Sequence, residues 1–254
     1  SIVPNKTPLY LTNGNITYND GEQLRRLLYS FRYRKMLADI QQDCTDGHLL
    51  RAAEKAEGLL AQGRGNAQVL QIAVAAYLES QDTANAVRVA DEYAARLDFR
   101  SEEFNELALR LALAECLPQA LACFQQAKIL DSRNTTVRVN HGFCLLCLGQ
   151  NQDAIAEFTP LITDKIHGVY ALSNRGLAKT RLGDTDAGYS DLEAALRINP
   201  QEPYAQMNLG IFYFEKQDFA RALPFFEQTH AINPDTYPLG KYLEPTRQAV
   251  QAGP

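Results

Sequence analysis

The chain has no tryptophan and only two methionines among its 254 residues, and no apolar run approaches the ~20 residues of a membrane-spanning helix. We therefore expect no direct insertion into a membrane. Basic residues are also sparse, since 25 Lys and Arg face 30 Asp and Glu and give a net charge of −5. Affinity for nucleic acid depends on clustered cations, so this composition argues against nucleic-acid binding as the main task.

Cysteine is present without a pattern. The chain has 5 cysteines, an odd number, and their spacing matches no disulfide framework. Cys144 and Cys147 form a CxxC inside a predicted helix, but no second such pair accompanies them and the four histidines are scattered. We interpret these thiols as buried helix residues and predict no metal site. Free thiols slightly favour a cytoplasmic over a periplasmic location.

Motifs that carry enzyme chemistry are missing as well. The sequence contains no HExxH, no GxSxG, no phosphate-binding GxxxxGK[ST] and no GxGxxG. We therefore predict that the protein is not an enzyme and that it requires no cofactor.

What the sequence does contain is an internal repeat with a constant period. Asn174, Gly176 and Pro200 recur at one and the same offset as Asn208, Gly210 and Pro234. Small residues recur in two columns with this period, and two antiparallel helices can approach closely only where such residues meet. The columns are Ala108, Gly142, Gly176 and Gly210, and Ala86, Ala120, Ala154, Gly188 and Ala222. A third column of Phe124, Phe158, Leu192 and Phe226 would fill the space between hairpins.

The ends of the predicted helices carry matching signals. Gly149 and Gly183 stand where a helix C-terminus favours a left-handed residue. Asp184 and Asp218 are plausible N-caps, and Pro200 and Pro234 end the second helices.

This pattern resembles the tetratricopeptide repeat, a helical hairpin of about 34 residues. Leu209, Gly210, Tyr213, Asp218 and Phe219 match residues typical of that family, as do Ala222, Phe226 and Pro234. The resemblance implies an all-α fold, a right-handed superhelical solenoid of antiparallel helix pairs. The segment 164–168 lacks a closing proline, and we expect it to bend the stack irregularly.

The repeat register divides the chain into segments. We expect an extended arm over 1–21, N-terminal helices and a degenerate repeat over 22–66, and a capping segment over 237–254. Between them, five hairpins are predicted over 67–100, 101–134, 135–168, 169–202 and 203–236. Within 22–44, the apolar residues fall mostly on one face of a helix: Leu24, Leu27, Leu28, Phe31, Met36 and Leu37.

In repeats of this kind the first helix of each unit lines a concave surface. Asn140, Asn174 and Asn208 share one inner position and could hold the backbone of an extended peptide, similar to the asparagine ladders of O-GlcNAc transferase and the importins. The alternative is that these amides satisfy local backbone groups. The other inner positions are unusually apolar and predict a hydrophobic groove, unless neighbouring helices bury them. They are Leu109, Leu113, Phe143, Leu146, Tyr170, Leu177, Tyr204, Ile211 and Phe214.

The resemblance therefore implies a non-catalytic scaffold or adaptor that binds a protein or peptide partner, either extended or as an amphipathic helix. The repeats resemble those of adaptors in bacterial secretion, pilus or exopolysaccharide machines. The cations of the chaperone-tail clamp are missing, so an acidic tail is not the expected ligand. An alternative is a self-assembling subunit, a homo-oligomer in which the N-terminal arm fills its own groove or that of a neighbour.

Overall fold

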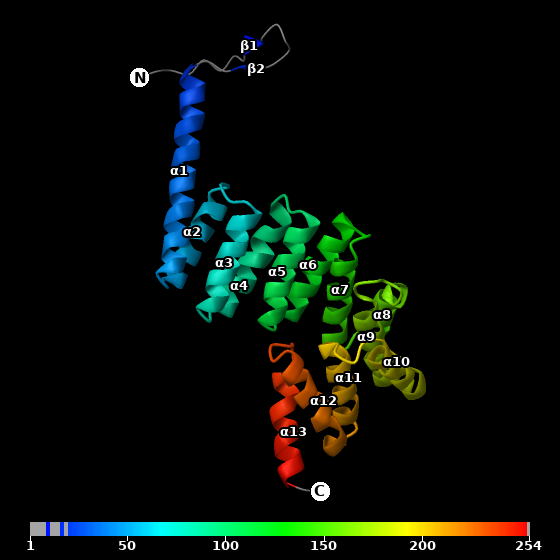
Figure 1. Cartoon of the computed structure of the whole chain (residues 1–254). Coiled ribbons are helices and arrows are strands. Elements are labelled where there is room, and N and C mark those ends of the chain that lie inside the picture. The colour runs from blue at the N-terminus through cyan, green and yellow to red at the C-terminus, as the bar shows by residue number, and fades with distance from the viewer. Residues whose placement is uncertain (1–8, 11–15, 18–19, 253–254) are drawn as a thin grey trace. The chain divides into compact units, whose positions relative to one another are not determined.

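The structure is a computed structural model that describes residues 9–10, 16–17 and 20–252, with side chains from residue 30 onward. Apart from two short strands, its elements are helices that pack in antiparallel pairs (Figure 1). The fold is therefore an all-α solenoid, as the sequence predicts. The helices are α1 (Asp20–Thr45), α2 (Leu49–Ala61), α3 (Ala67–Glu79), α4 (Thr83–Tyr93), α5 (Ser101–Leu113), α6 (Leu117–Leu130), α7 (Thr135–Cys147), α8 (Asn151–Phe158), α9 (Gly168–Arg181), α10 (Thr185–Ile198), α11 (Pro203–Glu215), α12 (Phe219–Ile232) and α13 (Gly240–Ala252), with 3-10 turns η1 (Ala94–Arg96) and η2 (Thr159–Leu161).

The strands β1 (Leu9–Tyr10) and β2 (Ile16–Thr17) pair antiparallel within the predicted N-terminal arm. The rest of that arm, apart from the first residues of α1, lies outside the described residues, so its place as a groove ligand stays a prediction.

The chain divides into two compact units, Ser1–Leu97 and Asp98–Pro254, which are described separately. In unit 1, consecutive helices from α1 to α4 contact one another around Ala52, Ala56, Leu70 and Val74, all of which are fully buried. Only part of the apolar face predicted for 22–44 lies among the described side chains, where Met36 and Leu37 are half-buried. Phe31 is 67% exposed, and of the predicted face Leu24, Leu27 and Leu28 lie among the residues whose side chains are not described.

One turn position recurs through both units with a left-handed backbone. Its residues have φ between 60° and 90° and follow one another with the period of the repeat: Gly47, Gln81, Glu115, Gly149, Gly183 and Gln217. A residue in this conformation ends one helix and lets the chain reverse. The recurrence also includes Gly47, between α1 and α2, which agrees with the degenerate repeat predicted within 22–66.

The small residues occupy the helix crossings, as predicted. Gly176 of α9 and Gly188 of α10 approach so closely that a Cβ on Gly188 would lie 2.6 Å from the carbonyl oxygen of Gly176. A Cβ on Gly210 would lie 2.7 Å from the Phe226 ring. The bulky column is buried too, with Phe124, Phe158, Leu192 and Phe226 at most 1% exposed. Crossings of this kind let the two helices of one hairpin pack closely.

The predicted helix caps are only partly confirmed. The Asp218 carboxylate accepts a hydrogen bond from the backbone N–H of Arg221 at 3.1 Å and so caps α12. Asp184 is the N-cap residue of α10, as predicted, but its side chain makes no capping hydrogen bond. The side chain of Asp184 is exposed, and its carbonyl instead accepts from the Gly188 N–H at 3.0 Å.

Unit 2 changes direction after α8. This helix has only 8 residues, ends at Phe158 and continues as the 3-10 turn η2 before α9 starts at Gly168. The paired helices α6, α10 and α12 each have 14 residues. Beyond the short α8 the stack turns back, so that α11, α12 and α13 follow one another in the opposite direction to α5, α6 and α7 in this view (Figure 1).

The helix α13 closes the end of unit 2 and lies within the predicted capping segment 237–254. Leu239 and Leu243 belong to the hydrophobic core of the unit, and the Tyr242 ring stacks on Phe226 with centroids 5.6 Å apart. Packing of α13 on α12 covers apolar surface that would otherwise face water.

Candidate functional site

Four aromatic side chains gather on the inner side of unit 2. Phe143 comes from α7, Tyr170 from α9, Tyr204 from α11 and Tyr237 from the turn before α13. Tyr170 and Tyr204 meet edge to face with centroids 4.8 Å apart, and Phe143 lies 5.8 Å from Tyr204 and 6.3 Å from Tyr237. Edge-to-face contacts place the positive ring edge against a negative face. We call these four residues the aromatic cluster.

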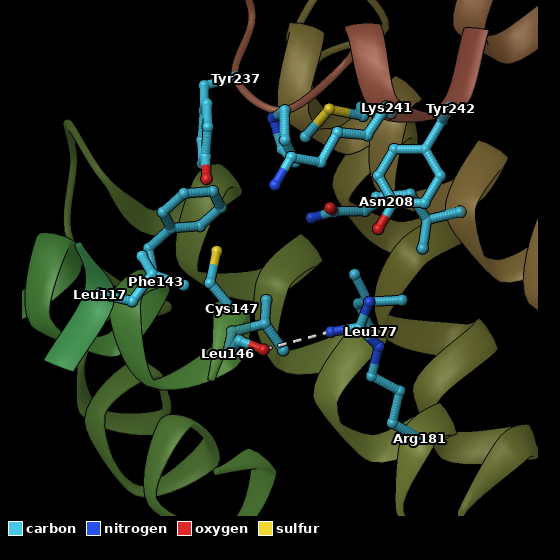
Figure 2. A pocket seen from close by; sticks show the side chains of 13 residues that line it. Leu117, Phe143, Leu146, Cys147, Leu177, Arg181, Asn208, Tyr237, Lys241 and Tyr242 are labelled. Carbon is cyan, nitrogen blue, oxygen red and sulfur yellow. Dashed lines mark hydrogen bonds between the residues drawn. The ribbon is translucent and has the colours of Figure 1, made fainter. Parts of the chain in front are cut away.

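Two adjoining cavities flank this cluster, and we call them together the inner groove. The first has a volume of about 100 Å³ and a mostly apolar lining: Leu109, Ala112, Leu113, Leu117, Phe124, Asn140, Phe143, Cys144, Cys147, Tyr170, Tyr204 and Tyr237. The second has a volume of about 120 Å³ and shares Leu117, Phe143, Cys147 and Tyr237 with the first. Figure 2 shows it between the side chains of α7 and those of α13.

The cations beside the second cavity already have partners. Arg181 donates to the Glu215 carboxylate at 2.7 Å and to the backbone carbonyl of Leu146 at 3.3 Å, the bond dashed in Figure 2. Its guanidinium thereby connects α7, α9 and α11. Lys241 lies 2.6 Å from the carboxylate of Glu115, and this hydrogen bond raises the pKa of Lys241.

The two cysteines of the groove are free thiols of α7, and Cys144 is buried whereas Cys147 is half-buried. Burial raises the pKa of Cys144 to about 12 and that of Cys147 to about 11. Both thiols therefore stay protonated near neutral pH and are poor nucleophiles and poor metal ligands. Within the part of the chain that the structure describes, no three His, Cys, Asp or Glu side chains come close enough to hold a metal ion.

The three asparagines do not form an exposed ladder. Asn174 and Asn208 are at most 1% exposed, and the Asn208 amide donates to the Asn174 side-chain carbonyl at 3.1 Å. The Asn174 amide donates to the backbone carbonyl of Tyr170 at 2.8 Å. Only Asn140 is partly accessible, and its amide donates to Asn105 at 2.9 Å. Asn174 and Asn208 are thus engaged with each other and with the backbone, although Asn208 also lines the second cavity, and the binding of a peptide by this column stays a prediction.

The apolar positions separate into two groups. Leu109 and Leu113 are 39% and 65% exposed, and Phe143, Tyr170 and Tyr204 are half-buried around the first cavity. The other group is covered: Leu146, Leu177 and Ile211 are at most 3% exposed and form the floor of the second cavity, and Phe214 packs on Tyr242 at 5.3 Å. The accessible hydrophobic groove is therefore lined by fewer of these residues than the sequence predicts.

Sequence reasoning did not place the C-terminal residues in the groove. Tyr237 and Lys241 line it although they lie in the predicted capping segment. The sequence contains a signal for this placement. Tyr237 lies one period of the repeat after Pro203, the first residue of the last hairpin, and Tyr242 lies one period after Asn208. The segment thus continues the register of the inner helices. Glu115, which contacts Lys241, occupies the recurring turn position, and the sequence does not predict it as a groove residue.

A family model described as tetratricopeptide repeat matches residues 169–202. Two curated relatives match over 120 residues: Superkiller complex protein 3 of Mus musculus at 27% identity and tetratricopeptide repeat protein 37 of Xenopus laevis at 28%. The match covers 46% of this chain but only 8% of each relative.

Solved structures show the same fold. A tetratricopeptide repeat protein from Parabacteroides merdae superimposes with a TM-score of 0.57 at 14% identity, covering 85% of this chain and 84% of that one. A MamA protein gives a TM-score of 0.52 at 17% identity, covering 65% of this chain and 90% of that one. The recurring turn, the small residues at the helix crossings and these likenesses lead to one conclusion. The chain has the fold of tetratricopeptide repeat proteins, and its residues 169–202 match that repeat.

Proposed function

We propose that this protein is a non-catalytic adaptor that binds a polypeptide segment of a partner in the inner groove of unit 2. Tetratricopeptide repeat proteins are generally scaffolds for protein–protein interaction, and they use concave surfaces of this kind. The observation that carries the proposal is the exposure of Leu109 and Leu113 beside a cavity lined with aromatic rings. A single exposed apolar residue needs no explanation, but two exposed leucines joined to a cavity lined by aromatic rings form the kind of apolar patch that partners cover.

The size of the cavities favours a polypeptide over a small molecule. Their volumes are about 100 and 120 Å³, below the ~300 Å³ at which pockets for small ligands begin. A cavity of this size suits one side chain of a partner, with the exposed leucines covering its neighbours. Aromatic residues are frequent anchors in such interfaces.

The pKa values of the groove residues support a role without catalysis. Among the described residues that line it, each group with a shifted pKa has been moved away from neutrality. Burial raises the pKa of Tyr170, Tyr204 and Tyr237 as well as those of the two thiols. General acids and bases instead need pKa values near the working pH. The setting in a bacterial secretion, pilus or exopolysaccharide assembly stays a prediction from the repeat composition.

A phage-displayed library of random dodecapeptides tests the proposal. Peptides selected by the wild-type chain should lose at least ten-fold in affinity for Leu113→Glu, because a carboxylate would be placed against the apolar ligand surface. Ile129→Glu is the matched control, since Ile129 is 73% exposed on α6 but does not line the groove. Equal binding by wild type and Leu113→Glu would show that the groove is not the binding site.

A further inference from the structure

The chain's own C-terminal residues occupy part of the inner groove. Tyr237 places its ring at a centroid distance of 6.3 Å from Phe143, at an interplanar angle of 74°. Four residues later, Lys241 reaches the carboxylate of Glu115 at 2.6 Å. Glu115 lies in the turn between α5 and α6, and Phe143 lies in α7, so both contacts cross the groove from its C-terminal side.

The backbone of this segment is anchored independently of those two side chains. Thr236 and Leu239 are 3% and 2% exposed, and the Leu239 N–H donates to the Thr236 carbonyl at 2.8 Å. Leu243 continues the anchor into the core of unit 2. Tyr237 and Lys241 project from this anchored segment toward the groove, as Figure 2 shows for the tyrosine ring near Phe143. They can therefore leave the groove while α13 stays in place.

Their contacts are of a kind that a ligand can replace. The Lys241 and Glu115 side chains are 51% and 58% exposed, and an ion pair between exposed groups contributes little to stability. The Tyr237 ring is half-buried and meets Phe143 at its edge. Arg181, the other cation of the groove, is neutralised by Glu215, so Glu115 supplies the negative charge that faces the incoming segment.

We propose that the side chains of Tyr237 and Lys241 occupy the part of the groove that two side chains of the partner bind. The partner segment presents an aromatic residue and, four residues later, a lysine or arginine, and it displaces this pair of side chains when it binds. The inference rests on the proposed function and specifies its ligand: the aromatic ring enters the cluster with Phe143, Tyr170 and Tyr204, and the cation pairs with Glu115. Because a closed groove must open first, the apparent affinity of the wild-type chain is reduced by the fraction of molecules that are open.

A peptide with the sequence of residues 235–243, DTYPLGKYL, labelled with fluorescein, is a direct probe. Its binding to the full chain is measured by fluorescence anisotropy for wild type and for the double variant Tyr237→Ala/Lys241→Ala. The variant should bind at least ten-fold more tightly, because its own segment no longer competes. Glu115→Gln added to the double variant should weaken binding of this peptide, but not of an analogue in which glutamine replaces the lysine. Circular dichroism checks that each variant keeps its helix content.

Equal affinity of wild type and the double variant would overturn the inference, as would equal binding of an analogue with alanine in place of the tyrosine. The library selection separates this failure from that of the proposed function. Selected peptides that depend on Leu113 but show no aromatic residue four positions before a cation would leave the proposed function standing and remove the inference. Peptides whose affinity is unchanged by Leu113→Glu would contradict both the proposed function and the inference.

Discussion

The side-chain amide of Asn208 donates a hydrogen bond to the side-chain carbonyl of Asn174 over a distance of 3.1 Å. The two residues hold equivalent positions in successive hairpins, and both are buried. Asn208 also donates to the Ser173 hydroxyl at 3.3 Å. The Asn174 and Asn208 amides therefore connect neighbouring repeats, and Asn208 also lines the second cavity of the groove.

We expect Asn208→Ala to lower the free energy of unfolding by about 1–3 kcal/mol, because it leaves the Asn174 carbonyl without its partner in the interior. Urea denaturation measures this change. Asn140→Ala is the control: Asn140 is only half-buried, so its loss should cost less. If Asn208→Ala were as stable as wild type, the column would have no structural role.

Glu157 is a buried acidic residue of α8. Burial alone would raise its pKa, but contacts with His141 and Lys128 outweigh burial and lower the pKa from 4.5 to about 2. The His141 Nδ1 lies 3.5 Å from this carboxylate, and Lys128 and Arg138 form ion pairs with it.

Glu157→Gln should therefore destabilise the protein at neutral pH. Because the folded pKa lies below the ordinary value, the stabilisation by the carboxylate is complete above pH 4.5 and disappears as the pH falls toward 2. The shift corresponds to at most about 3 kcal/mol. Urea titrations at pH 7, 4 and 3 should show the difference between wild type and variant shrinking as the pH falls. A constant difference would contradict this assignment.

The recurring turn position predicts opposite effects for two glycines that both have open space around them. Gly183 has a φ of 90°, whereas Gly58 lies within α2 in a helical conformation. Gly183→Ala should destabilise by about 1–2 kcal/mol, because a Cβ disfavours the left-handed region. Gly58→Ala should stabilise by about 0.5–1 kcal/mol, because alanine loses less backbone freedom on folding. Thermal unfolding of both variants checks the signs, and destabilisation by Gly58→Ala would refute this reasoning.

The two candidate caps allow a paired comparison as well. Asp218→Ala should lower stability by about 1 kcal/mol, because the first turn of α12 loses the acceptor for the Arg221 N–H. Asp184→Ala should change stability by less, since Asp184 makes no side-chain cap hydrogen bond. If chemical denaturation gave the two variants equal losses of unfolding free energy, the side-chain cap of α12 would not contribute to stability.

Much of this protein was determined by its sequence alone, because a helical hairpin is specified locally. Glycine and alanine at the crossings, Phe226 and its equivalents between hairpins, and the turn residues Gly149 and Gly183 all act within one hairpin or on the next one. These contacts are short in sequence and repeat, so the spacing is enough to predict them.

The groove was decided only by the tertiary structure. Whether Asn174 faces a partner or the interior depends on how closely successive hairpins pack, and the meeting of Lys241 with Glu115 joins two ends of unit 2 that are far apart in the sequence. The missing closing proline at 164–168 predicts an irregular bend after the short α8, but it does not say which residues the bend brings together. A repeat specifies each hairpin and its immediate neighbour, whereas contacts across the concave side depend on the sum of all the angles between them.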